Sequence, residues 1–490
     1  MHPMGGPVPQ QGSRKASPWV LWAPVAVTVV LALFTVVEVF RSGSVESTNS
    51  EVPALATVAF VVLGVCFAAP LLLQRLDLRL SAVVPWLVGA ASLILSVILG
   101  MLWTPVVAAS SWADVVSRGL HVPRGLAQFW DLSLVLKSVD CASHGFDVYA
   151  ANNGCLPQPS IYGPGTLWLQ YVPFDLFSAR NATTLGFISL LISSVALAWI
   201  ARQASPRGQV VLLVAAVGGP WLLLLERANF DAYVIWAAVL LVFLVRRWNS
   251  MWAWTVGAAI IWLVGTWKYY PFALGLMLIP VVRLRRGWIV LAGFVAASGS
   301  FVVLTWDNLI FSLHANEAMA ISPDLVILGR FPVVARMIGA DADPTTRDFG
   351  DLVFLLLAGA AFLWGIAFAR CLRGARRTES MLAIGGSTLF LASVLVAGFG
   401  YAYKAAFLLL IVPLVALPRR ARDRFLLYSS VVVLVLTTVA SVVTWNTVLA
   451  TLAGVVAAAF GLGASSALLV RFVRGDSEPS RQRSEPTAGR

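Results

Sequence analysis

The chain has 490 residues, of which 59% are hydrophobic and only 12% are charged. Soluble domains devote roughly a quarter of their residues to charged side chains, so this composition excludes a soluble globular protein and predicts a polytopic, all-α membrane protein. The net charge of +12 does not indicate nucleic-acid binding, because the Lys and Arg residues fall in short clusters between apolar runs, where they mark topology.

Apolar runs long enough to cross a bilayer recur along the chain. The first exceeds the apolar core of a secretory signal and has no small-residue cleavage site close behind it, so we expect a retained helix. The ends at 1–17 and 473–490 are rich in Pro, Ser and charge, which predicts disordered cytoplasmic segments. Together with shorter runs, about fourteen spans are expected. The runs are 18–40, 53–74, 82–105, 183–202, 208–225, 230–246, 251–267, 287–305, 351–370, 382–400, 424–446 and 448–471, and the shorter ones are 271–284 and 404–418.

Clusters of Lys and Arg lie in every second connection between these runs. By the positive-inside rule, both termini are then cytoplasmic and the remaining connections face outward. The apolar stretch 167–177 is expected to be re-entrant or interfacial, because another crossing there would invert every later basic loop. An apolar helical face over 112–120 predicts an interfacial helix. The unusual polar residues collect in the outward connections, which are 106–182, 226–231, 267–271, 306–350 and 400–404.

Two cysteines share the outward segment "CASHGFDVYAANNGC", at Cys141 and Cys155. An exported loop permits a disulfide, so we predict that these two thiols are paired; two unlinked thiols are the alternative. A zinc site is not predicted, because His144 alone does not complete a set of ligands.

Three carboxylates lie in "QFWDLSLVLKSVDCASHGFDVY", at Asp131, Asp140 and Asp147. Acids in an exposed loop are ordinarily solvated. Asp131 differs because Phe129 and Trp130 precede it and an apolar run follows it, which would hold it near the bilayer surface. A carboxylate at that depth can accept a proton from a hydroxyl group, so Asp131 is the predicted general base, with Asp140 and Asp147 as alternatives.

Cations stand in three separate outward turns: Arg227 in "ERANFD", Lys268 in "TWKYYP" and Lys404 in "GYAYKAAF". Taken singly, each can be a snorkelling side chain, and Arg227 can be an ion-pair partner of Glu226. Together, on one side of the membrane, they predict an anion-binding site. A lipid-linked phosphate suits such a site, because its negative charge grows as its sugar departs. The predicted reaction is therefore sugar transfer from a lipid phosphate.

An aspartate in the first large outward loop, followed by "FDVY", "YGPGTLW", "ERANFD", "KYYP" and "YAYK", resembles the polytopic GT-C glycosyltransferases. Within them, the chain is most similar to glycosyltransferase family 87, a group of bacterial mannosyltransferase-like proteins. The resemblance covers roughly 80–420, a catalytic membrane core. The helices of 18–79 precede this core and are an addition to it, and those of 421–472 follow it.

The resemblance implies an inverting enzyme with a polyprenyl-phosphate-sugar donor, no nucleotide-sugar site, and no metal or other cofactor. It makes Asp131 the general base, although the adjacent acidic pair of other GT-C branches is absent here. It assigns the donor phosphate to Arg227, Lys268 and Lys404. The residues that would line the sugar and acceptor pocket are Tyr162, Asn229, Asp231, Tyr269 and Tyr403.

The expected setting is the outer face of the plasma membrane, with mannose as the sugar and a glycolipid or polysaccharide as the acceptor. Other classes of protein also present cations and aromatic side chains to lipid-linked sugars. A lipid-linked sugar flippase or transporter, or a surface-glycan ligase or polymerase, is therefore the alternative. A secondary transporter would favour broken helices and polar residues near the bilayer midplane.

Overall fold

The computed structural model describes residues 83–101, 129–150, 154–156, 158–216, 219–320, 327–328, 344–369, 372, 377–396, 400–415 and 446–474. Helices supply nearly all of the regular structure in this part of the chain, so the predicted all-α class is confirmed there. The exception is a short antiparallel pair, in which β1 (Ile327–Leu328) bonds to β2 (Gly400–Tyr401).

Most of the helices are α-helical, and the η elements are 3₁₀ helices apart from the π-helical η6. The helices are α3 (Val84–Met101), α6 (Trp130–Ser143), η2 (Pro164–Tyr171), η3 (Pro173–Asp175), η4 (Ala179–Asn181), α7 (Ala182–Gln203), α8 (Pro206–Ala216), α9 (Gly219–Glu226), α10 (Asp231–Trp248), α11 (Met251–Lys268), η5 (Tyr270–Arg283), α12 (Trp288–Leu304), α13 (Trp306–Ala320), α15 (Pro344–Phe368), α16 (Arg377–Leu391), η6 (Ala392–Val396), η7 (Ala402–Ile411), α17 (Val412–Val415) and α19 (Asn446–Arg474).

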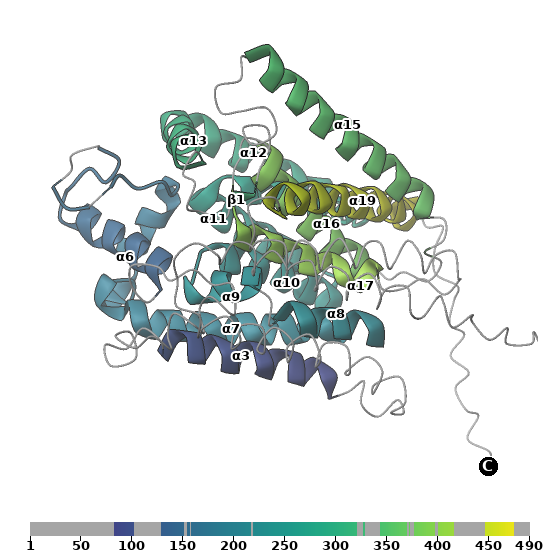
Figure 1. Cartoon of the computed structure of the whole chain (residues 1–490), viewed down its shortest axis with the longest axis horizontal. Coiled ribbons are helices and arrows are strands. Elements are labelled where there is room, and N and C mark those ends of the chain that lie inside the picture. Colours follow the sequence, from purple (N-terminus) through teal and green to yellow (C-terminus); the bar gives the residue numbers. More distant parts are fainter. Residues whose placement is uncertain are drawn as a thin grey trace, which may run out of the picture.

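The helices form a bundle whose two flanks are packed pairs (Figure 1). The pair α3 and α7 lies along one flank, α15 packs on α19 along the other, and α10, α11 and α16 fill the space between. Small residues set the spacing of the first pair: a Cβ on Gly89 would approach the Ser194 carbonyl oxygen to 3.0 Å. Ser92 then accepts hydrogen bonds from the Ser194 hydroxyl at 3.2 Å and from Trp221 Nε1 at 2.8 Å. Small residues and buried polar bonds of this kind join helices in membranes.

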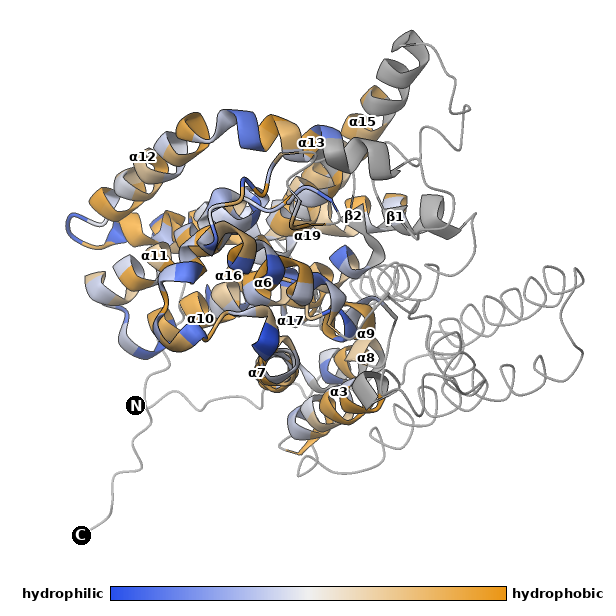
Figure 2. Cartoon of the chain, turned by 90° about the vertical axis from the view of Figure 1, so that its left-hand side faces the viewer, coloured by the Kyte–Doolittle hydropathy of each residue, from blue (hydrophilic) through white to orange (hydrophobic). Residues whose placement is uncertain are grey.

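Hydrophobic residues recur along the helices, α12 among them (Figure 2). Along α12, Trp288, Val295 and Leu304 are exposed, and α15 exposes Leu355 and Trp364. Many exposed large apolar side chains are unfavourable in water and natural in hydrocarbon. This surface is consistent with membrane insertion.

Two helices within the described residues are long and apolar enough to cross a membrane: Pro173–Gln203, which runs from η3 into α7, and Gly454–Arg474. Two bent pairs raise this number to four if each pair is one span. The first bends by 108° between α9 and α10, and the second bends by 71° between α12 and α13. The prediction of about fourteen spans is not settled by this part of the chain. The predicted runs 18–40 and 53–74 lie outside it, as do the predicted interfacial helix 112–120 and all but the last residue of the run 424–446.

The two shorter apolar runs take an unexpected form. Predicted at 271–284 and 404–418, they fold mainly as the 3₁₀ helices η5 and η7. Pro280 inside η5 lacks the amide hydrogen that an α-helix would use there. A 3₁₀ helix rises about 2.0 Å per residue, so the 14 residues of η5 extend about 28 Å. That length approaches the bilayer hydrocarbon thickness of about 30 Å, which the same residues would not reach as an α-helix.

Candidate functional site

Asp131 is carried by the first turn of α6 and faces the bundle. Phe129 caps this helix in the left-handed region, with a φ of 51°, and its ring is completely buried against Gly186. Anchored in this way, the first turn directs the Asp131 side chain inward, where the residue is only 7% exposed. The Leu132 amide donates to the Arg227 carbonyl oxygen at 3.4 Å, which ties the start of α6 to the α9–α10 turn.

The turn between α9 and α10 buries its polar side chains. Ala228 has a positive φ of 44°, at the break where the chain bends by 108° between α9 and α10. Glu226, Arg227, Asn229 and Asp231 are all buried, and Asp231 is fully so. Asn229 Oδ1 accepts a 2.9 Å bond from the Asp231 amide. This bond satisfies one of the orphan amides at the start of α10.

A third residue with positive φ separates α11 from η5. Tyr269 has a φ of 58° and a ψ of −57°, so Lys268 ends one helix and Tyr270 begins the next. Positive φ is uncommon for residues other than glycine. Phe129, Ala228 and Tyr269 thus place backbone strain in three of the segments that meet here, and such strain concentrates at functional sites.

Two carboxylates pair with three cations across these segments. Arg227 Nη1 lies 3.6 Å from Asp131 Oδ1. Asp231 holds both lysines: Oδ1 is 2.7 Å from Lys268 Nζ, and Oδ2 is 2.5 Å from Lys404 Nζ. Charges taken out of water cost several kcal/mol each unless they are paired and hydrogen-bonded. The pairs therefore explain how so many ionised groups are buried together.

Tyrosines complete the surroundings of Asp231. The Tyr270 hydroxyl donates to Asp231 Oδ1 and accepts a 2.9 Å bond from Lys404 Nζ. The Lys404 ammonium also lies 4.1 Å from the centre of the Tyr270 ring and 5.7 Å from that of Tyr403. Aromatic faces at these distances stabilise a desolvated cation.

Asn229 joins the two ion-paired groups into one network. Its Nδ2 donates to Asp131 Oδ2 and, at 2.9 Å, to the Tyr403 hydroxyl. Its Oδ1 accepts from Lys268 Nζ at 2.7 Å. Buried ionisable residues in an apolar bundle are functional candidates. We call Asp131, Arg227, Asn229, Asp231, Lys268, Tyr270, Tyr403 and Lys404 the charged cluster.

Tyr162 lies over one side of the charged cluster, with the centre of its ring 5.1 Å from Lys268 Nζ. The "YGPGTLW" segment positions Tyr162, because the Gly163 amide donates to the Trp267 carbonyl oxygen at 2.7 Å. A Cβ on Gly163 would come within 2.3 Å of the Thr266 carbonyl oxygen, so only glycine permits this approach. The Tyr149 hydroxyl donates to the Tyr162 carbonyl oxygen at 3.1 Å, and burial raises the pKa of the Tyr149 phenol.

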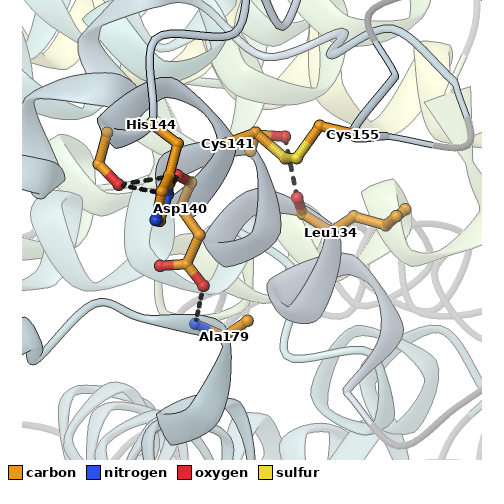
Figure 3. The surroundings of a disulfide bond; sticks show 8 residues. Leu134, Asp140, Cys141, His144, Cys155 and Ala179 are labelled. Atoms are coloured by element: carbon orange, nitrogen blue, oxygen red, sulfur yellow. Dashed lines mark hydrogen bonds between the residues drawn. A yellow bond between two sulfur atoms is a disulfide. The ribbon is translucent and has the colours of Figure 1, made fainter.

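Asp140 and Asp147, the alternative bases, make bonds within their own loop. Asp140 Oδ2 accepts from the Ala179 amide at 3.0 Å and lies beside the disulfide that joins Cys141 to Cys155 (Figure 3). Asp147 is exposed and accepts from the Tyr149 amide at 3.0 Å. Among the described residues, these contacts of Asp140 and Asp147 lie outside the charged cluster, whereas Asp131 pairs with Arg227. The geometry therefore favours Asp131 among the three.

Two of the predicted pocket residues occupy different places from those expected. The Tyr269 hydroxyl donates to the Thr305 carbonyl oxygen at 3.3 Å, and its ring packs 5.9 Å from that of Phe301. The turn with positive φ at Tyr269 directs Tyr270 into the cluster instead, a difference that the doublet "YY" does not reveal. Asp231 was expected to contact sugar hydroxyls, but both of its oxygens are engaged in holding Lys268 and Lys404.

No group of three or more His, Cys, Asp or Glu side chains suited to a metal ion occurs among the described residues. Searches for similar proteins found no matching family model, no matching curated protein and no matching solved structure. The resemblance to GT-C glycosyltransferases therefore stays a prediction, and the argument for function depends on the charged cluster.

Proposed function

We propose that this protein is a membrane-embedded inverting glycosyltransferase. It moves a sugar, mannose by the family resemblance, from a polyprenyl-phosphate donor to a glycolipid or polysaccharide acceptor at the outer face of the plasma membrane. The observation that carries the proposal is the burial of Asp131 in one network with Arg227, Lys268 and Lys404, which come from distant parts of the chain.

The charges suit the two halves of the reaction. Asp131 accepts the proton of the acceptor hydroxyl as its oxygen bonds to the anomeric carbon of the sugar. The bond from that carbon to the donor phosphate breaks, and the phosphate leaves with an additional negative charge. Cations fixed beside the leaving group stabilise this charge most strongly in the transition state.

The lysines retain capacity for a phosphate while they are paired. Each ammonium has three hydrogens to donate. Among the described residues, Lys268 uses two, toward Asn229 and Asp231, and Lys404 uses two, toward Asp231 and Tyr270. One hydrogen on each lysine is thus left for a phosphate oxygen. Asp231 keeps the two ammonium groups close enough to bind the same anion.

The proposed topology has about fourteen spans and cytoplasmic termini. Its support is the separation of the charged cluster from the basic helix ends. Asp231 begins α10, and Arg246 and Arg247 end it. Arg246 follows Asp231 by 15 residues along α10, which puts about 23 Å between these groups. If the arginines face the cytoplasm, the charged cluster lies near the outer face.

The test is sugar transfer in membranes that contain Asp131→Asn and receive a labelled polyprenyl-phosphate mannose. Loss of a general base lowers the rate about 10²- to 10⁴-fold. Asp175→Asn is the matched control, since Asp175 is exposed and has a left-handed backbone that Asn also adopts. Wild-type rates in the folded Asp131→Asn protein would contradict the proposal.

A second candidate is a flippase or transporter of lipid-linked sugars. The observation in its favour is the 108° bend between α9 and α10 at the charged cluster, because broken helices often form transport sites. Purified protein in vesicles separates the two functions. A flippase moves the labelled lipid between leaflets and forms no new glycosidic bond, whereas the glycosyltransferase forms that bond. A ligase or polymerase would instead transfer a preassembled glycan.

A further inference from the structure

The Asn229 side chain uses its complete hydrogen-bonding capacity. A primary amide has two N–H donors and two acceptor lone pairs. The donors bond to Asp131 Oδ2 and to the Tyr403 hydroxyl, and the acceptor oxygen receives Lys268 Nζ and the Asp231 amide. Asn229 is 1% exposed, so water does not compete for these bonds.

These four partners permit only one orientation of the amide. In the reversed orientation, the Asn229 oxygen would face the Asp131 carboxylate, and its NH₂ group would face the Lys268 ammonium and the Asp231 amide. Both contacts would bring like partial charges together, and buried polar groups would lose their partners. The network therefore fixes the Nδ2 side toward Asp131.

We infer that Asn229 is the positioning residue that aims Asp131 and couples it to the phosphate-binding lysine, Lys268. This inference rests on the proposed glycosyltransferase function. The amide holds one oxygen of the Asp131 carboxylate by a hydrogen bond, and Arg227 lies beside the other. Donation to a carboxylate stabilises its ionised form, which is the form that accepts a proton.

The same amide links the two halves of the reaction through one rigid group. Lys268 binds its oxygen while Asp131 binds its nitrogen, so the base and this cation are held at one spacing. A donor phosphate on Lys268 then fixes its sugar at a defined distance from the base. Correct placement of reacting groups contributes several orders of magnitude to enzymatic rates.

Asn229→Asp tests the inference because it keeps the shape and replaces the NH₂ group by oxygen. When ionised, the new carboxylate repels Asp131; when protonated, it can donate to Asp131 as Asn229 does. The charged and titratable groups that face this pair are Arg227, Lys268, Asp231, Lys404 and the Tyr403 and Tyr270 hydroxyls. The kcat of the variant should fall more steeply with rising pH than that of the wild type.

The assay measures kcat and KM for polyprenyl-phosphate mannose from pH 5 to pH 9, in steps of about one pH unit. This range covers the raised pKa that a buried carboxyl group can have. We expect kcat of Asn229→Asp to fall at least about tenfold at the alkaline end and to recover at acid pH. Asn229→Ala should lose kcat at every pH. Asn249→Asp is the matched control, since Asn249 is an exposed left-handed cap at the far end of α10.

The outcomes separate the two claims. If wild-type protein transfers no sugar from any polyprenyl-phosphate donor, the proposed function is wrong, and this inference falls with it. If wild-type protein is active and the kcat of Asn229→Asp depends on pH in the same way as that of the wild type, Asn229 has only a structural role. An alkaline fall in kcat that is larger for folded Asn229→Asp than for the wild type and Asn249→Asp supports the positioning role.

Discussion

The two ends of α6 carry chemically identical carboxylates with different surroundings. Asp131 in the first turn is buried among Arg227 and Asn229, whereas Asp140 near the last turn accepts from the Ala179 amide beside the disulfide. The first belongs to a network of ionised groups and the second to a local loop structure. A carboxylate is thus a candidate base because of the charges around it, and the two ends should respond differently to substitution.

The largest effect is expected where the charged network is broken at its centre. Asp231→Asn would leave the Lys268 and Lys404 ammonium groups buried without their shared counter-charge. Removal of one partner from a buried ion pair costs about 3–5 kcal/mol. Thermal unfolding in detergent should show a clear loss of stability, with loss of sugar transfer. Asp307→Asn, at an exposed carboxylate, is the control. An unchanged unfolding temperature would show that the pairs contribute little.

At the other end of α6, the disulfide should matter for stability and not for chemistry. Cys141→Ser with Cys155→Ser removes a link between residues 14 apart in the sequence, which costs about 2–4 kcal/mol. We expect a lower unfolding temperature and a normal rate per folded molecule. If the double variant is fully folded and its rate of sugar transfer still falls, the loop must act on the site through the bond from Tyr149 to Tyr162.

The neighbouring residues Tyr269 and Tyr270 allow a closer comparison, because only Tyr270 belongs to the charged cluster. Tyr270→Phe removes a donor to Asp231 and an acceptor for Lys404, and a buried group left unsatisfied costs about 1–3 kcal/mol. Tyr269→Phe removes only a bond to the Thr305 carbonyl oxygen. Sugar-transfer rates and unfolding temperatures should fall more for Tyr270→Phe. Equal effects would argue that Tyr270 has no special part in the cluster.

The smallest effect is expected from Asp140→Ala, measured beside Asp131→Ala. Loss of its bond to the Ala179 amide costs about 1 kcal/mol. Sugar transfer per folded molecule should stay at the wild-type level for Asp140→Ala and collapse for Asp131→Ala. The reverse result would move the general base to the loop end of the helix.

The sequence by itself identified much of the charged cluster. Arg227, Asp231, Lys268 and Lys404 interrupt apolar runs, and charge is unfavourable in hydrocarbon unless it is paired. The same rule made the outward turns the place to look for a site. Local chemistry also predicted the pairing of the two loop cysteines and the all-α class, because composition and spacing decide both.

Only the tertiary structure decided which of these groups meet. The pairing of Asp231 with two lysines joins residues that are far apart in the chain, so no local pattern contains it. The placement of Tyr270 rather than Tyr269 in the cluster depends on the positive φ of Tyr269. The hydrogen bond of Asp140 depends on the Ala179 segment that packs against it. Hydrophobic patterning shows where polar turns interrupt the apolar runs. The packing of distant helices determines which of these turns form ion pairs with one another.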